Sequence, residues 1–293
     1  MIGRNDNCWC GSQKKWKNCH FPLTNDSSSS KDYSQLKKEY KKHQILIKTP
    51  EQIEGIRHAS VLASNILEAT CEMAREGITT LELNDFAEKL HREAGAIAAP
   101  YHYGTPPYPK SICTSINEVI CHGIPDKTTL KNGDIVNIDV TSLLNGYYGD
   151  CSKMVCIGKV SPERQRVVDV SYECLMRSIA ILRPGIPLSA IGDVIEDYAT
   201  AHQCSVVNQF VGHGIGIHFH EGPQVPHFRN SMSILLIPGM TFTIEPMINA
   251  GKREAVIDAD QWTARTCDLR ASAQWEHTLL ITDEGHEILT NWK

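Results

Sequence analysis

The chain carries one sequence pattern twice, in the same order in its two halves. The segment Asn132–Asp139 resembles Pro238–Glu245, because glycine, isoleucine and a final carboxylate fall at matching positions. Further along, Gly149–Asp150 matches Trp275–Glu276, and a carboxylate again coincides with a carboxylate. Repeated order over long segments predicts two related halves, with a site where the halves meet.

Five candidate metal ligands lie within or close to these repeated segments. They are four carboxylates and one imidazole: Asp139, Asp150, His213, Glu245 and Glu276. A set rich in oxygen ligands suits a pair of divalent first-row ions better than one structural zinc. A histidine between two glycines is often only a turn residue, so the assignment of His213 depends on the other four ligands.

The first two carboxylates are expected to converge through a β-hairpin. Residues 134–141 alternate apolar and polar side chains, as a half-buried strand does. Asn145 and Gly146 form the pair that favours a two-residue hairpin loop. With that loop, Asp139 lies opposite Ser152, and Asp150 lies on the same face of the sheet. A register shift of one residue would place the two carboxylates on opposite faces.

Charge divides the chain into a short basic head and a long acidic body. Residues 1–48 hold ten Lys and Arg against four Asp and Glu, and the rest hold nineteen against thirty. A basic head predicts docking to an anionic surface such as ribosomal RNA; a solvated tail without a partner is the alternative. No apolar run is long enough to cross a membrane. Eleven cysteines without an export signal favour reduced thiols in the cytoplasm.

Three segments are expected: a cysteine-rich segment at residues 1–21, a linker at 22–44 and one catalytic body at 45–293. The first segment offers the ligands of a closed tetrahedral zinc site: Cys8, Cys10, Cys19 and His20. Because so short a segment has no hydrophobic core of its own, metal binding would provide most of its folding free energy. A redox-active or incidental thiol cluster is the alternative.

Two resemblances extend these predictions. The spacing of the four head ligands resembles the SEC-C motif, which implies zinc binding and a docking role. The body resembles the type I methionine aminopeptidases over residues 45–293. That resemblance is carried by Ser115–Pro125, Asp134–Asp139, Gly149–Asp150, Gly212–Gly216, His220–Glu221, Thr241–Pro246 and Glu276–His277. It implies the α+β fold called pita bread, with two pseudo-symmetric halves in which helices cover a curved antiparallel sheet.

The resemblance also implies residue roles in a two-metal hydrolysis that removes the initiator methionine from nascent chains and favours a small second residue. The five candidate ligands would bind the metal pair, and Glu245 would also act as general base. His220 would hydrogen-bond the scissile carbonyl oxygen, and His122 would contact the substrate near its amino terminus. A monovalent cation would lie near Asn117 and Ser272. The methionine pocket would be lined by Tyr108, Cys113, Phe219 and Trp262.

Some alternatives stay open at this level. The loop 101–108 is longer than the family pattern, so Tyr101, Tyr103 or neither fills one tyrosine position of the pocket. Manganese, iron, cobalt and zinc would all accept these ligands. The family implies a monomer. The rival functions are an X-Pro aminopeptidase or prolidase of the same fold, a creatinase-like enzyme without metal, and a non-catalytic relative that binds RNA or protein. Intact acids at every ligand position disfavour the last two.

Overall fold

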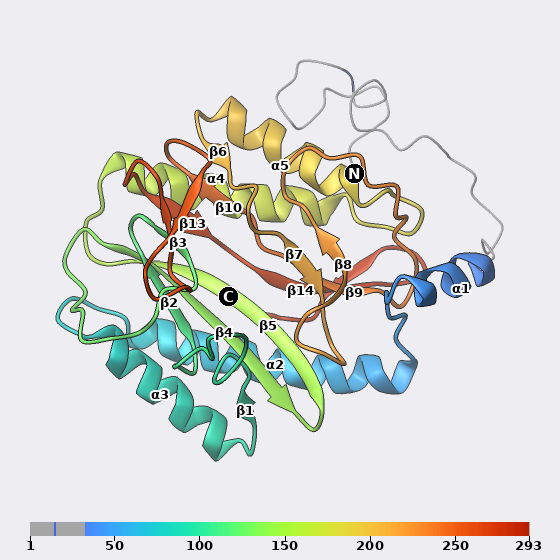
Figure 1. Ribbon diagram of the computed structural model, residues 1–293, viewed down its shortest axis with the longest axis horizontal. Coiled ribbons are helices and arrows are strands. Elements are labelled where there is room, and N and C mark those ends of the chain that lie inside the picture. The colour runs from blue at the N-terminus through green and yellow to red at the C-terminus, as the bar shows by residue number, and fades with distance from the viewer. Residues whose placement is uncertain (1–14, 16–32, 293) are drawn as a thin grey trace.

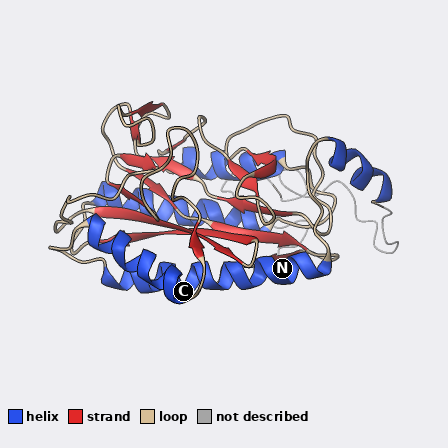
Figure 2. Cartoon of the chain, turned by 60° about the horizontal axis from the view of Figure 1, so that its bottom comes forward, coloured by secondary structure: helices blue, strands red, loops and turns tan. Residues whose placement is uncertain are grey.

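The computed structural model describes residue 15 and residues 33–292. The predicted zinc ligands Cys8, Cys10, Cys19 and His20 lie outside the described residues. Two pairs of helices flank the strands (Figure 1), and a second view shows the long helices packed beneath the strands (Figure 2). This arrangement is the predicted α+β fold with two similar halves.

The first half begins with two capped helices. The side chains of Thr49 and Thr79 each accept a hydrogen bond from the backbone N–H three residues on. In return, the Gln52 and Glu82 side chains accept from the backbone N–H groups of the two threonines. These capping boxes fix where α2 (Pro50–Met73) and α3 (Thr80–Glu93) start. The strands of this half are β1 (Ile97–Ala98), β2 (Cys113–Ile116), β3 (Val119–Cys121), β4 (Ile135–Leu144) and β5 (Tyr147–Cys156).

The β4–β5 hairpin forms in the predicted register. Pairing is antiparallel along both strands, and Asp139 faces Ser152. Asn145 and Gly146 both have positive φ angles, 52° and 85°, as a two-residue hairpin turn requires. The other edge of β4 pairs with β1 and β2. Asp139 and Asp150 therefore lie on one face of this sheet.

Helix α2 packs directly on β4 and β5. The closest approach is at Gly149, where an added Cβ would lie 2.4 Å from the Cα of Ser60 in the helix. Only glycine fits so close to another backbone. The residue before Asp150 thus lets the helix support the strand that carries this carboxylate.

The second half repeats the plan with two helices followed by strands. Helix α4 (Pro162–Ala180) begins at Ser161, whose side chain accepts from the Arg164 N–H, and α5 (Ser189–Ala201) follows it. A five-stranded sheet runs in the order β15-β14-β9-β7-β8, and β10 pairs with β13 and β6. The strands are β6 (Ser205–Val206), β7 (Gly212–Gly214), β8 (Glu221–Val225), β9 (Thr241–Ile244), β10 (Met247–Asn249), β11 (Ala255–Ile257), β12 (Ala264–Thr266), β13 (Ser272–Gln274), β14 (His277–Ile281) and β15 (His286–Ile288).

The two halves are joined where the matched carboxylates lie. Ser152 of β5 forms an antiparallel bridge with Glu276, just before β14. Two residues along, the Thr278 hydroxyl donates to the Asp150 carbonyl oxygen at 2.8 Å and accepts from the Asp150 N–H at 3.2 Å. The sheets of the two halves therefore meet beside Asp150 and Glu276, as the internal repeat predicts.

The last part of the predicted linker is helical and packs on the body. Helix α1 (Ser34–Lys42) buries Tyr40, whose hydroxyl donates to the Leu235 carbonyl and accepts from the Leu235 N–H. After the helix, Ile45 is buried and bridges Gly222. Residues 34–45 are thus attached to the second half of the body. None of the described helices combines the length and the apolar character needed to span a bilayer.

Candidate metal centre

The five predicted metal ligands converge from both halves of the fold. Asp139 lies on β4, Asp150 on β5 and His213 on β7, while Glu245 follows β9 and Glu276 precedes β14. All five line one cavity of about 430 Å³. Residues far apart in the sequence are therefore brought together as the repeated pattern predicts.

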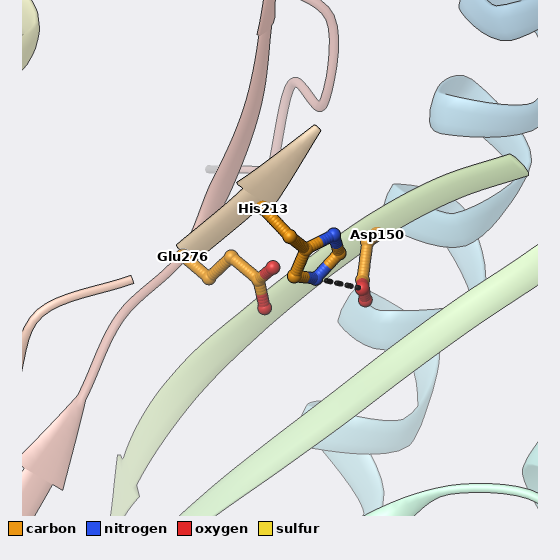
Figure 3. Close-up of side chains that lie close together, drawn as sticks. All are labelled: Asp150, His213 and Glu276. Carbon is orange, nitrogen blue, oxygen red and sulfur yellow. Dashed lines mark ion pairs between the residues drawn. The ribbon is translucent and has the colours of Figure 1, made fainter. Parts of the chain in front are cut away.

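Three of the ligands form the tightest group. Ligand atoms of Asp150, His213 and Glu276 all lie within 4.8 Å of one another, and the imidazole lies between the two carboxylates (Figure 3). His213 Nε2 is 3.7 Å from Asp150 Oδ2 and 3.6 Å from Glu245 Oε1. Asp139 interacts with the Asp150 side chain, which places the fifth ligand in the same cluster.

Hydrogen bonds from neighbouring side chains orient the ligands. The Thr141 hydroxyl donates to Asp150 Oδ1 at 2.7 Å. The Thr243 hydroxyl donates to Glu245 Oε1 at 2.7 Å, and Gln274 Nε2 donates to Glu245 Oε2 at 3.0 Å. Such supporting contacts fix the direction of ligand lone pairs and tune a metal site. The sequence patterns did not predict these three residues, although Thr141 and Thr243 each lie two residues from a ligand on the same strand face.

The tautomer of His213 suits a metal ligand. Its Nδ1–H donates to the Gly214 carbonyl oxygen at 3.0 Å, so the lone pair of Nε2 faces the carboxylates. Burial lowers the pKa of this imidazole to about 4, so the ring is neutral at physiological pH. A neutral imidazole with one nitrogen held by a backbone carbonyl is the usual form of a metal-binding histidine.

The four carboxyl groups of the site are costly to ionise together. Burial raises the pKa of Asp139 to about 7 and that of Glu245 to about 8. Burial and the neighbouring acids raise the pKa values of Asp150 and Glu276 well above their usual range. Buried carboxylates at such short range are stable as anions only beside a compensating cation. The donor set therefore fits divalent metal ions.

The predicted substrate residues share the cavity with the ligands. His122, His220, Tyr108, Cys113, Phe219 and Trp262 all contribute to its wall. Tyr108 is buried and donates to the Gly123 carbonyl oxygen at 2.9 Å, and its ring contacts Trp262 edge to face. Tyr103 lines the same wall and Tyr101 does not, although both side chains are partly exposed to solvent. Tyr103 is thus the loop tyrosine that reaches the pocket.

The residues predicted to hold a monovalent cation lie side by side, outside the lining of this cavity. The Ser272 N–H donates to the Asn117 carbonyl oxygen at 2.8 Å, and Asn117 has a positive φ of 54°. Asn117 lies instead on a second, polar hollow with Glu118 and Asp134. The cation itself stays a prediction.

Tyr103 also contacts the predicted carbonyl-binding histidine. Its hydroxyl lies 2.8 Å from His220 Nδ1, and its ring packs against His220 and Phe219. Burial lowers the pKa of His220 to about 3, so the ring is neutral. When the phenol donates to Nδ1, the proton of the imidazole resides on Nε2, where it is free to donate to a substrate.

Tyr103→Phe is expected to lower kcat/KM for a methionyl tripeptide by about three- to tenfold, the usual worth of one hydrogen bond. The exposed Tyr101 provides a matched control, since Tyr101→Phe removes a hydroxyl from the same loop. Steady-state kinetics of both variants test this contact. Equal activity of the two variants would show that the Tyr103 hydroxyl does not support His220.

Comparison with known proteins agrees with this geometry. Residues 54–283 match the metallopeptidase family M24, and residues 4–22 match the SEC-C motif. The crystal structure of methionine aminopeptidase from Rickettsia prowazekii superposes with a TM-score of 0.82 at 44% identity, covering 84% of this chain and 100% of that one. The prolidase from Pyrococcus furiosus, at 23% identity and a TM-score of 0.68, shares the fold alone.

The chain therefore belongs to the M24 metallopeptidases, and its pita-bread fold is confirmed. Within that family it belongs with the methionine aminopeptidases. The enzyme of that name from Chlamydia muridarum is 57% identical over 288 residues, covering 98% of both chains. The X-Pro peptidase alternative is not favoured by these comparisons.

Proposed function

We propose that the protein removes the initiator methionine from nascent polypeptides by metal-dependent hydrolysis, and prefers substrates with a small second residue. The observation that carries this proposal is the shared cavity, in which the five ligands adjoin the slot lined by Tyr108, Cys113, Phe219 and Trp262. An aromatic and sulfur-bearing slot selects methionine by burial and soft contacts. Cleavage beside the ligands would then release that residue.

The ligand set would bind two divalent ions, which activate a water molecule and polarise the scissile carbonyl when they are present. We propose manganese, iron, cobalt or zinc as the ions, since all accept carboxylate and imidazole ligands. Asp139 and Asp150 would bind from the first half, and His213, Glu245 and Glu276 from the second. Ligands from both halves place the reacting atoms at the junction of the fold.

The remaining steps belong to side chains of the chain itself. Glu245 would accept the proton of the attacking water, and Thr243 and Gln274 hold its two oxygens in place for this transfer. His220, neutral in the folded protein, would donate from Nε2 to the carbonyl oxygen as negative charge develops there. His122, also neutral and half-buried beside Trp262, would contact the substrate near its amino group.

A panel of tripeptides that differ at the second residue tests the substrate proposal. Met-Ala-Ser should be cleaved with a kcat/KM at least about tenfold higher than Met-Leu-Ser. A small difference in side-chain size at a binding pocket changes the free energy of the transition state by roughly 1–3 kcal/mol. Release of free methionine is measured by amino-acid analysis. Equal cleavage of both peptides would remove the small-residue preference, while cleavage of neither would remove the proposed activity.

The head of the chain has a separate proposed role. We propose that Cys8, Cys10, Cys19 and His20 bind one structural zinc ion and that the head docks the enzyme to the ribosome, through its basic charge. The match of residues 4–22 to the SEC-C motif supports this proposal. Action on chains as they leave the ribosome implies work in the cytoplasm, and we propose that the enzyme acts as a monomer.

Deletion of residues 1–32 is expected to leave tripeptide turnover within about twofold while weakening co-sedimentation with ribosomes. This boundary retains α1, because Tyr40 of that helix is buried against Leu235 of the body. Ribosome pelleting at two salt concentrations measures the association, which should fall as salt rises if charge carries it. Loss of tripeptide turnover would instead make the head a part of the catalytic unit.

A further inference from the structure

The loop between β7 and β8 places two predicted substrate residues on the cavity, Phe219 and His220. Its backbone turns at Gly216, where φ is 135°. The next two backbone N–H groups, of Ile217 and His218, both donate to Glu221 Oε1, at 2.6 and 2.8 Å. One carboxylate oxygen thus anchors the segment that leads directly to Phe219 and His220.

The second oxygen of the same carboxylate forms a buried ion pair. Glu221 Oε2 accepts from Lys48 Nζ, and both side chains are 1% exposed. The Lys48 ammonium also donates to the Leu46 carbonyl oxygen at 3.2 Å. Both oxygens of Glu221 and two of the three ammonium protons therefore have partners. Removing one member of such a pair leaves an uncompensated buried charge.

Lys48 is itself fixed by the segment that precedes the catalytic helices. Its N–H donates to the Gly239 carbonyl oxygen at 2.8 Å, and Ile45 bridges Gly222, the residue after Glu221. Helix α1 precedes Ile45 in the chain and is attached to the body through the hydrogen bond between Tyr40 and Leu235. The N-terminal edge of the body thus braces the β7–β8 loop through Ile45 and Lys48, which do not line the cavity, whereas Glu221 does.

A buried ion pair is weak grounds for stability, since its desolvation opposes the charge attraction, but it can hold one geometry against others. The geometry held here is that of a loop that contributes none of the five metal ligands. An anchor with this placement is expected to act on turnover without altering metal binding.

We propose that Lys48 and Glu221 are positioning residues for the reaction, which hold the β7–β8 loop so that His220 and Phe219 meet the substrate. This inference rests on the proposed function. The Glu221 carboxylate positions the backbone of the loop, and Lys48 positions the carboxylate. Neither residue needs to touch the substrate for this role.

Four variants separate the parts of this anchor. Glu221→Ala removes the acceptor, Glu221→Gln keeps an acceptor but removes the charge, and Lys48→Met removes the cation at similar length. The double variant Lys48→Met with Glu221→Gln keeps an acceptor without buried charge. The matched control is Glu287→Gln, which breaks the partly exposed pair that Arg57 of α2 forms with β15. Each protein is studied as the full chain loaded with Mn²⁺.

Glu221→Ala is expected to lower kcat for Met-Ala-Ser by roughly 10²-fold with a smaller change in KM, the effect of about 1 Å of misplacement. Mn²⁺ affinity by calorimetry should stay within about twofold of the unchanged protein. Amide hydrogen exchange at residues 217 and 218 should become faster. The double variant should lose less activity than the sum of the losses from Lys48→Met alone and Glu221→Gln alone, because the two residues act together.

Two results would overturn the proposal. Exchange of amides 217 and 218 at the unchanged rate in Glu221→Ala would show that the carboxylate does not hold the loop. Faster exchange with kcat within about twofold of the unchanged protein would show that the loop needs no anchor for turnover. If Glu221→Ala does not fold, amide exchange at residues 217 and 218 and kcat are both measured on the double variant, and the same two results would overturn the proposal. A wild-type chain that releases no methionine would contradict the proposed function, whereas the exchange result would still test the anchor.

Discussion

Replacement of Glu245 by alanine is expected to lower kcat/KM for Met-Ala-Ser by at least about 10³-fold, because a metal ligand and the proposed general base are lost together. The residue lies at the end of β9, and its two oxygens are held by Thr243 and Gln274. The fold should persist, since removing this acid from a cluster of buried acids also removes a repulsive charge.

The matched control is Glu284→Ala, which removes an exposed acid from the turn before β15. Circular dichroism establishes that both variants are folded, and steady-state kinetics at saturating Mn²⁺ gives the turnover. Turnover of Glu245→Ala within about tenfold of the unchanged protein would contradict both roles assigned to this carboxylate.

The second large effect concerns stability and pH. Without metal, the protein should become less stable as pH rises from about 6.5 to 8. The folded-state pKa values of Asp139 and Glu245 are raised to about 7 and about 8, while the same groups in the unfolded chain ionise near pH 4. The folded state therefore binds more protons in this window, and unfolding becomes more favourable as pH rises.

The histidines of the site act in the opposite direction, but at lower pH. Burial lowers the pKa values of His213 and His220 to about 4 and about 3, against about 6.5 in the unfolded chain. Their contribution to stability grows as pH rises through that range and levels off above about pH 7.5. Of these acids and histidines, the acids therefore set the slope as pH approaches 8.

Each buried carboxyl group that stays protonated contributes a loss of roughly 1 kcal/mol per pH unit. Bound Mn²⁺ should abolish this loss, since the ions replace the protons and stabilise only the folded state. Calorimetric melting with chelator and with Mn²⁺, at pH 6.5, 7.2 and 8, measures both curves. The protein without residues 1–32 serves as a control for metal removed from the head. Parallel curves with and without Mn²⁺ would show that the cluster does not bind the ions.

The sequence predicted the first half of the site from local rules. Asn145 and Gly146 determine the hairpin turn, the turn determines the register, and the register places Asp139 and Asp150 on one face. The second half required the internal repeat, since Glu276 reaches the site through a bridge to Ser152 that no local pattern predicts. Convergence of the ligands was predictable for that reason, although their supporting bonds were not.

Other features depend on contacts between distant segments. The lysine-rich residues before the body read as a linker. Tyr40, however, is buried and has a hydrogen-bond partner 195 positions away, which makes α1 part of the fold. Lys48 entered the sequence analysis only through the basic charge of residues 1–48, and its burial follows only from the position of Glu221. Burial of a charged residue depends on its tertiary partner, which composition does not reveal.

The most direct test of the account is release of the N-terminal residue from Met-Ala-Ser and Ala-Pro-Phe, with chelated protein and with added Mn²⁺ or Co²⁺. We expect release of methionine from the first peptide only, and only with metal. Cleavage of Ala-Pro-Phe would make the protein an X-Pro aminopeptidase, and no cleavage of either peptide with any metal would contradict an enzymatic role.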